Sequence, residues 1–202
     1  MDLVLGFLLL LVLLPLFGAI ALAVRLDSHG PVLHRARRAG LDGRPITVFK
    51  FRTMTINAVL GSRITRARDP RITRVGARLR RWKLDELPQI WNVLRGDMSL
   101  VGPRPEDPRF VQTYTPEQRE VLSVRPGITG PSQLVFRHEE DLLDTDDPEE
   151  TYVQELLPRK LLIDLEYART HNLVGDIRIL ISTVLSRRRG AGQDLLYGRR
   201  AS

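Results

Sequence analysis

An acidic pair, Asp85 and Glu86, lies in one of the most arginine-rich parts of this chain. Asp is a preferred first residue of a helix, and the helix dipole favours acidic side chains in the first turn by about 0.3 to 1 kcal/mol. Helix capping therefore accounts for the pair without any chemistry. The surroundings suggest a second role, since four cations come just before the pair: Arg78, Arg80, Arg81 and Lys83.

The turn-rich segment GDMSLVGPRP, which follows the same predicted helix, adds a further cation. Arg guanidinium groups match phosphate oxygens bidentately, and in Pro103-Arg104-Pro105 the Arg is held between two residues of restricted φ. Mg²⁺ would bridge carboxylate and phosphate oxygens and neutralise charge that repels an attacking anion. With an ordinary pKa of about 3.9, Asp85 is ionised at neutral pH and needs no base to attack phosphorus. The set fits a diphosphate substrate and an aspartyl-phosphoryl intermediate.

A short helix must position the acidic pair. Apolar side chains recur at three- and four-residue steps through DELPQIWNVLRG and form one inward-facing stripe: Leu84, Leu87, Ile90, Trp91 and Leu94. Pro88 is tolerated only in the first turn, so the helix is predicted to begin at about Asp85 or Glu86. Gly96 ends it.

A β-hairpin is predicted before this helix, from PVLHRARRAG and ITVFKFRTM around the Asp42-Gly43 turn. Lys50 and Arg52 are two residues apart and would share one face of the second strand. Residues 152–185 are predicted to be helical again. They either pack on the core, which is the default, or lie at a membrane interface.

The run from Leu3 to Val24 has no charged residue, and as a helix it would reach about 33 Å against a hydrocarbon core of about 30 Å. It predicts a membrane-inserted segment over residues 1–24. Only Met1 and Asp2 precede the run, which disfavours a cleaved signal peptide. The arginines that follow place residues 25–202 on the cytoplasmic side of the membrane: Arg25, Arg35, Arg37 and Arg38.

Pro15 lies in the middle of this segment and removes a helical hydrogen bond, at a cost of roughly 3 kcal/mol in a regular helix. Kinked spanning helices are common in lipid. The alternative is a re-entrant helix that bends at Leu14-Pro15 and returns to the cytoplasmic leaflet. The physics of the sequence leaves both arrangements open.

Composition limits the classes of molecule that this chain is expected to bind. The 202 residues carry a formal net charge of +7, which predicts an anionic partner: nucleic acid, an acidic membrane or a phosphorylated small molecule. The basic segment from Arg63 to Arg81 has Trp82 as its only neighbouring aromatic, which disfavours nucleic acid. The chain has no cysteine, and its histidines are scattered, so zinc is not expected. The acidic tract 138–150 is interpreted as a solvated loop.

The segment from Asp69 to Pro105, DPRITRVGARLRRWKLDELPQIWNVLRGDMSLVGPRP, resembles the central signature of the bacterial sugar transferases, the monotopic phosphoglycosyl transferases. The membrane run with its proline, GPV and KFRTM of the hairpin, RPGITGPSQ and the closing YVQELLPRKLLIDLEYARTHNLVGDIRILISTV resemble further family blocks in family order. The resemblance implies an α/β, mostly helical fold with a small β-hairpin. It also implies a re-entrant membrane helix broken at Pro15, and a compact catalytic domain with interfacial amphipathic helices.

The resemblance also implies a function. Members transfer a phosphosugar from a UDP-sugar to a polyprenol phosphate such as undecaprenyl phosphate, release UMP and so begin glycan assembly. Asp85 would be the nucleophile and Glu86 would help it hold Mg²⁺, Arg80 would bind phosphate, and Pro103-Arg104-Pro105 would hold the nucleotide. Lys50 and Arg52 match basic positions of the hairpin, and membrane lipids are expected partners. A homodimer is left open.

The chain departs from the family pattern at Lys83, where Ser or Thr is common, at Leu14, where a polar residue is frequent, and at Glu106-Asp107-Pro108. Two other functions fit the residues: a membrane-tethered binding module for anionic ligands, and a metal-dependent phosphohydrolase with water as acceptor. The hydrophobic anchor favours a lipid acceptor over water.

Overall fold

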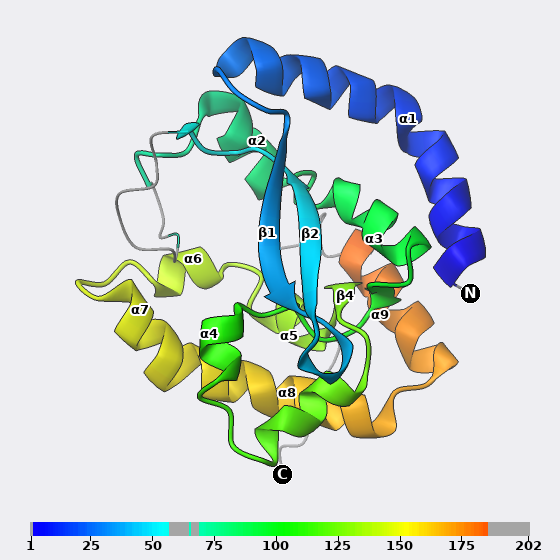
Figure 1. Cartoon of the computed structure of the whole chain (residues 1–202), viewed down its shortest axis with the longest axis vertical. Coiled ribbons are helices and arrows are strands. Elements are labelled where there is room, and N and C mark those ends of the chain that lie inside the picture. The colour runs from blue at the N-terminus through cyan, green and yellow to red at the C-terminus, as the bar shows by residue number, and fades with distance from the viewer. Residues whose placement is uncertain (1, 57–64, 66–68, 186–202) are drawn as a thin grey trace.

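The computed structural model describes residues 2–56, 65 and 69–185 (Figure 1). Its elements, in chain order, are α1 (Asp2–Asp27), β1 (Leu33–Ala39), η1 (Leu41–Gly43), β2 (Pro45–Phe51), α2 (Arg74–Arg81), η3 (Leu87–Gln89), α3 (Ile90–Leu94), β3 (Ser99–Val101), α4 (Pro108–Val111), η4 (Gln118–Ser123), β4 (Gly127–Thr129), α5 (Pro131–Val135), α6 (Glu139–Leu142), α7 (Pro148–Thr151), η5 (Tyr152–Leu156), α8 (Leu157–Thr170) and α9 (Leu173–Leu185). The predicted, mostly helical fold with a small hairpin is confirmed.

The hairpin forms where the sequence predicts it. β1 pairs with β2 in antiparallel register, from Leu33 opposite Phe51 to Ala39 opposite Pro45. Asp42 and Gly43 adopt left-handed φ values of 55° and 73° in the connection, which is the conformation that a tight hairpin turn requires. The end of β2 lies beside the acidic pair, because Phe51 N donates to the Asp85 carbonyl at 2.8 Å.

Pro15 does not break α1, so the prediction of a break there is wrong. The helix is continuous over 26 residues with Pro15 inside it, and Figure 1 shows it bowing around the rest of the molecule. A proline φ is compatible with helix, and the missing N–H removes one hydrogen bond to the carbonyl four residues earlier. The remaining bonds on either side hold the helix together.

Both ends of α1 contact the same domain. Near its start, Leu5 and Leu9 pack against a buried cluster that includes Leu100 of β3, and Ser99 Oγ donates to Asp2 Oδ2 at 2.7 Å. Near its end, Ile20 and Val24 are buried with residues of β2 and α2. Between these contacts many large apolar side chains of α1 are exposed, and the helix is long and apolar enough to cross a membrane.

A second sheet, which the sequence did not predict, holds the GPRP segment in place. β3 and β4 pair in parallel, with Ser99 opposite Gly127 and Val101 opposite Thr129. The backbones approach so closely that a Cβ on Gly127 would lie 2.1 Å from the Gly102 nitrogen, and only glycine fits such a contact. The loop after β3 is thereby fixed beside β4 and α5.

Candidate active site

Asp85 lies in a tight turn between α2 and η3. The turn begins at Lys83, whose φ of 51° is left-handed and unfavourable for a residue with a Cβ. Phe51 N donates to the Asp85 carbonyl at 2.8 Å, so the turn is fixed to the end of β2. The helix begins at Leu87 with Glu86 at the capping position, close to the predicted start.

The Asp85 carboxylate does not cap that helix. Asp85 is 9% exposed, and its Oδ1 has no hydrogen-bond partner within the described part of the chain. Burial, and then the charge of Glu86, raise the pKa of Asp85, while Lys50 and Arg80 oppose the rise. A buried carboxylate oxygen without a hydrogen-bond partner is costly to a fold, which makes Asp85 a candidate functional residue.

Glu86 is the centre of a buried charge cluster. Lys50 Nζ of β2 donates to Glu86 Oε1 at 2.7 Å, and Arg104 Nη1 from the loop after β3 donates to the same oxygen at 3.3 Å. Burial alone would raise the pKa of Glu86, but the charges of Lys50 and Arg104 outweigh it and lower the pKa. Three segments that are distant in sequence therefore meet at one ionised carboxylate.

A pocket with a volume of about 110 Å³ opens beside this cluster. Lys83 and Glu86, on either side of Asp85 in the chain, form part of its wall with Arg104. The other polar or charged lining residues come from β4, the α5–α6 region and the last two helices: Thr129, Gln133, Arg137, Glu139, Lys160 and Thr183. The wall is rich in cations and suits a ligand with several negative charges.

No role was predicted from the sequence for these lining residues of β4, the α5–α6 region and the last two helices. Gln133 is the last residue of RPGITGPSQ, and Lys160 lies in the segment that begins at Tyr152. Both segments resemble family blocks, which was the one sequence signal that pointed to these residues. Lys160 Nζ donates to Glu139 Oε2 at 2.8 Å, and both side chains are largely buried. Because Lys160 and Glu139 lie on different helices, their contact produces no helical or strand periodicity that could be detected in the sequence.

Arg80, the predicted phosphate ligand, is bound by a carboxylate in this structure. Its Nη2 and Nε donate to Glu140 Oε1 at 2.5 and 3.2 Å. Glu139 and Glu140 both belong to the acidic tract 138–150, so the interpretation of the tract as a solvated loop is wrong for these two residues. The positive charge of Arg80 still acts on Asp85: it favours the ionised carboxylate and so opposes the rise in the pKa of Asp85.

Arg52 lies outside the pocket lining and binds the end of α1. Its Nη1 donates to the His29 carbonyl at 2.8 Å, and its Nη2 donates to the carbonyls of Ser28 at 2.6 Å and Val24 at 3.3 Å. Carbonyls at a helix C-terminus lack intrahelical partners, and an arginine can supply the missing donors. The structure therefore separates Arg52 from Lys50, with which sequence reasoning had grouped it.

Replacing Arg52 by Met should lower the free energy of unfolding by roughly 1 to 3 kcal/mol, because buried carbonyls at the end of α1 lose their donors. The midpoint of thermal unfolding checks this. Arg37→Met, at an exposed position of β1, should change stability by less than about 0.5 kcal/mol. Equal effects of the two substitutions would contradict an anchoring role for Arg52.

The acidic pair has the donor chemistry of a magnesium site. In proteins Mg²⁺ is commonly held by one or two carboxylates together with substrate phosphates and water. Asp85 offers an oxygen without a hydrogen-bond partner in the described part of the chain, and Lys50 and Arg104 both donate to Oε1 of Glu86 and not to Oε2. Within the described ranges no cluster of three or more His, Cys, Asp or Glu could hold a metal alone, so the substrate would have to complete the site.

Comparison with known proteins matches this chain to a family. The model for "Bacterial sugar transferase" matches residues 1–189. Undecaprenyl-phosphate glucose phosphotransferase of Komagataeibacter xylinus is 42% identical over 195 residues, covering 91% of this chain and 34% of that protein. UDP-glucose:undecaprenyl-phosphate glucose-1-phosphate transferase of Escherichia coli (strain K12) is 42% identical over 193 residues, covering 91% of this chain and 38% of that protein.

A shorter relative is covered more fully. "Exopolysaccharide production protein PSS" of Rhizobium leguminosarum bv. phaseoli is 39% identical over 185 residues, which are 88% of each chain. The chain thus spans about a third of the length of the first two relatives and most of this one. With a family match over nearly its whole length, the chain belongs to the bacterial sugar transferase family.

Proposed function

We propose that this protein transfers a phosphosugar from a UDP-sugar to undecaprenyl phosphate, giving a polyprenol diphosphate sugar and UMP. The observation that carries the proposal is the buried carboxylate of Asp85, whose Oδ1 has no hydrogen-bond partner among the described residues and whose neighbour Glu86 lines a pocket rich in cations. Relatives named for UDP-glucose make that nucleotide sugar the first donor to test. The product would begin exopolysaccharide assembly, as the name of the Rhizobium relative suggests.

The reaction would take two displacements at one phosphorus atom. An Asp85 carboxylate oxygen attacks the phosphorus that bears the sugar; the bond from this phosphorus to the bridging oxygen breaks, and UMP leaves with that oxygen. A phosphate oxygen of undecaprenyl phosphate then attacks the same phosphorus and releases Asp85 as a carboxylate. Each step forms one P–O bond and breaks one.

The pocket cations would hold the donor during both steps. Arg104 presents a guanidinium to the pocket while Glu86 fixes its position, and Lys83 adds an ammonium next to Asp85. Bound Mg²⁺, held by Asp85 and Glu86, would supply further neutralisation of the phosphate charge. Arg80 would have to exchange Glu140 for the substrate diphosphate, whose two negative charges exceed the single charge of the Glu140 carboxylate.

The membrane arrangement that we propose is re-entrant. Contact of both ends of α1 with one domain supports it, because a helix that crossed the bilayer would carry Asp2 to the face opposite the domain. The exposed apolar side chains of α1 would lie in the cytoplasmic leaflet. The catalytic domain would then face the cytoplasm, where UDP-sugars are made.

A covalent adduct is the test of the proposed function. The purified protein is incubated with Mg²⁺ and a panel of UDP-sugars without a lipid acceptor, and the peptide that contains Asp85 is examined by mass spectrometry. A phosphosugar adduct is expected, together with one equivalent of UMP. Sustained UMP release without acceptor would favour a phosphohydrolase, and the absence of both adduct and UMP across the panel would refute the transferase.

The rate should also depend on pH through Asp85. Burial and the neighbouring Glu86 raise the pKa of Asp85, so its reactive ionised form is lost at a higher pH than for an ordinary Asp of pKa about 3.9. The acid limb of kcat/KM should therefore lie above that value. Arg80→Gln should move the limb further up, because Arg80 lowers this pKa. An acid limb at the ordinary Asp value in both proteins would contradict this.

The topology of α1 can be checked by labelling. The chain has no cysteine, so Asp2→Cys introduces a single thiol at the start of α1, and Glu120→Cys provides an exposed reference thiol in the domain. With a maleimide that does not cross membranes, both thiols should stay unlabelled in intact cells and react only after the membrane is opened. Labelling of position 2 alone from outside would mean that α1 spans the bilayer.

A further inference from the structure

We propose that Glu139 and Glu140, neighbours on α6, occupy two cations of the site until the donor binds, and that the diphosphate of the donor then takes these cations from them. The two cations are Lys160 and Arg80. The inference rests on the proposed function. It adds Lys160 to the residues that bind the donor, and it makes α6 a counter-ion that the donor must displace.

Lys160 is a buried cation in the wall of the pocket. It is 4% exposed and lines the pocket together with Arg104. Tyr152 holds its ammonium, which lies 4.9 Å from the centre of the Tyr152 ring and donates to the hydroxyl at 3.2 Å. Glu139 Oε2 accepts a second hydrogen bond at 2.8 Å. Because an ammonium group has three N–H donors, Lys160 has the capacity to bind a ligand as well.

Glu139 lies among more cations than one carboxylate can neutralise. Burial alone would raise the pKa of Glu139, but the charges of Lys160, Arg104 and Lys83 outweigh it and lower the pKa. All three of these cations line the pocket with Glu139. In the lining as a whole, four cations accompany two carboxylates. This excess of positive charge matches the two negative charges of a nucleoside diphosphate sugar.

Glu140 holds Arg80 in the same way. The Arg80 guanidinium donates to Glu140 Oε1 through both Nε and Nη2. Since Glu139 and Glu140 are adjacent, one short helix brings a carboxylate to each of two cations. Lysine and arginine bind carboxylate and phosphate oxygens through the same charged hydrogen bonds. The carboxylates of α6 and the diphosphate therefore compete for the same donors.

The structure of α6 suits a segment that can be displaced. The helix has four residues, and all four are half-buried or exposed. A helix this short is marginal by itself, and a segment with few buried apolar contacts opens at low cost. Leu143, directly after α6, belongs to a buried apolar cluster and anchors the chain there. The exchange therefore requires a movement of α6 and leaves the core in place.

UDP binding to the full-length protein in lipid nanodiscs tests the inference. The parent carries Asp85→Asn, which prevents turnover, and calorimetry gives the dissociation constant of UDP in the presence of Mg²⁺. Glu139→Gln and Glu140→Gln should each lower this constant roughly three-fold or more, because a cation loses its competing partner. Lys160→Met should raise the constant about ten-fold or more, since the diphosphate loses a charged hydrogen bond.

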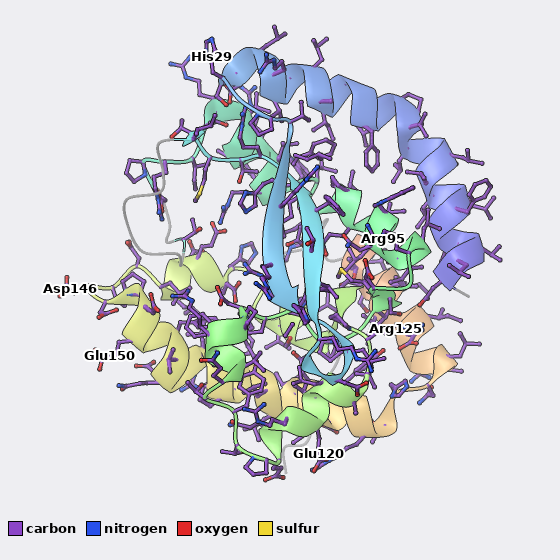
Figure 2. All side chains as sticks on the ribbon, in the orientation of Figure 1. His29, Arg95, Glu120, Arg125, Asp146 and Glu150 are labelled. Carbon is purple, nitrogen blue, oxygen red and sulfur yellow. The ribbon has the colours of Figure 1, made fainter. Side chains whose placement is uncertain are left out.

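The opposite signs separate this role from a structural one. Glu139→Gln and Lys160→Met break the same ion pair, so a pair that only shaped the pocket would give weaker binding in both. The matched control is Glu150→Gln, which removes a charge from the same acidic tract at an exposed position on the edge of the molecule (Figure 2). It should leave the constant unchanged. Weaker or unchanged UDP binding in both Glu139→Gln and Glu140→Gln would overturn the proposal.

A double variant covers the case in which Lys160→Met does not fold because Glu139 is left unpaired. Lys160→Met combined with Glu139→Gln removes both charges of the pair. It should bind UDP at least about ten-fold more weakly than Glu139→Gln alone, and equal affinities would overturn a contact between Lys160 and the donor. The titrations contain no prenyl phosphate, so the phosphate that is bound is that of the nucleotide. A parent that does not bind UDP at all would refute a nucleotide donor, and the proposed function with it.

Discussion

Asp85→Asn should abolish phosphosugar transfer and leave the protein at least as stable as the parent. An amide is too weak a nucleophile to form the covalent intermediate, and the loss should be at least roughly a thousand-fold, about 4 kcal/mol in the barrier. Both UMP release without acceptor and the adduct on the Asp85 peptide should disappear. Asp146→Asn, at an exposed position at the left edge of Figure 2, should have no effect.

The stability of the Asp85→Asn protein separates a catalytic carboxylate from a capping one. The pKa of Asp85 is raised, first by burial and then by Glu86, so the folded protein disfavours the ionised form. At neutral pH the charge of Asp85 therefore destabilises the fold, and a neutral isostere should raise the unfolding midpoint. A helix cap behaves in the opposite way, since its removal costs about 1 kcal/mol. An active protein with a lowered midpoint would return Asp85 to a capping role.

Local features of the sequence were sufficient to predict the elements that carry the site. Asp42-Gly43 marks the hairpin because a tight turn needs left-handed φ values, and both residues adopt them. Pro88 fixes the helix start because proline is tolerated in a first turn, and η3 begins at Leu87. The meeting of Glu86 with Arg104 could be inferred from charge and from the stiffness of the loop.

Contacts between segments that are distant in the chain could not be predicted from local sequence features. Arg52 follows Lys50 by two residues, just after β2 ends. Its side chain nevertheless donates to the carbonyls at the end of α1, because that helix end lies within reach. Glu140 belongs to a tract that composition marks as solvated, and only the folded chain brings it to Arg80. The parallel pairing of β3 with β4 depends on two short strands, and a strand of three residues has too little pattern to detect.

Glu86→Gln should be the most destabilising single substitution in the site. Glu86 is 9% exposed and neutralises two cations, Lys50 and Arg104. Breaking a buried ion pair by removing one partner costs roughly 3 to 5 kcal/mol, because the remaining charge is left uncompensated. Chemical denaturation at neutral pH measures the loss. Glu140→Gln breaks the more exposed pair with Arg80 and should cost no more than about 1 kcal/mol.

The pH dependence of stability gives a second measurement of the same charge. The pKa of Glu86 is lowered on folding: burial opposes the shift, but Lys50 and Arg104 outweigh it. The ionised carboxylate thus contributes stability above the unfolded pKa of about 4.3, and this contribution is lost as the pH falls below that value. The Glu86→Gln protein should lack this part of the acid-induced loss. An unchanged acid profile would mean that Glu86 carries no folding energy.

Combining Glu86→Gln with Lys50→Met then distinguishes a structural charge from a catalytic one. The double variant removes one of the two cations that Glu86 neutralises, so it should be more stable than Glu86→Gln alone, and the two effects should be strongly non-additive. Transfer should nevertheless be lost, because Gln has no negative charge with which to hold Mg²⁺ and Met has no donor for a phosphate. Recovery of stability together with transfer would show that Glu86 serves only to balance Lys50, and that Asp85 and Arg104 suffice for the reaction.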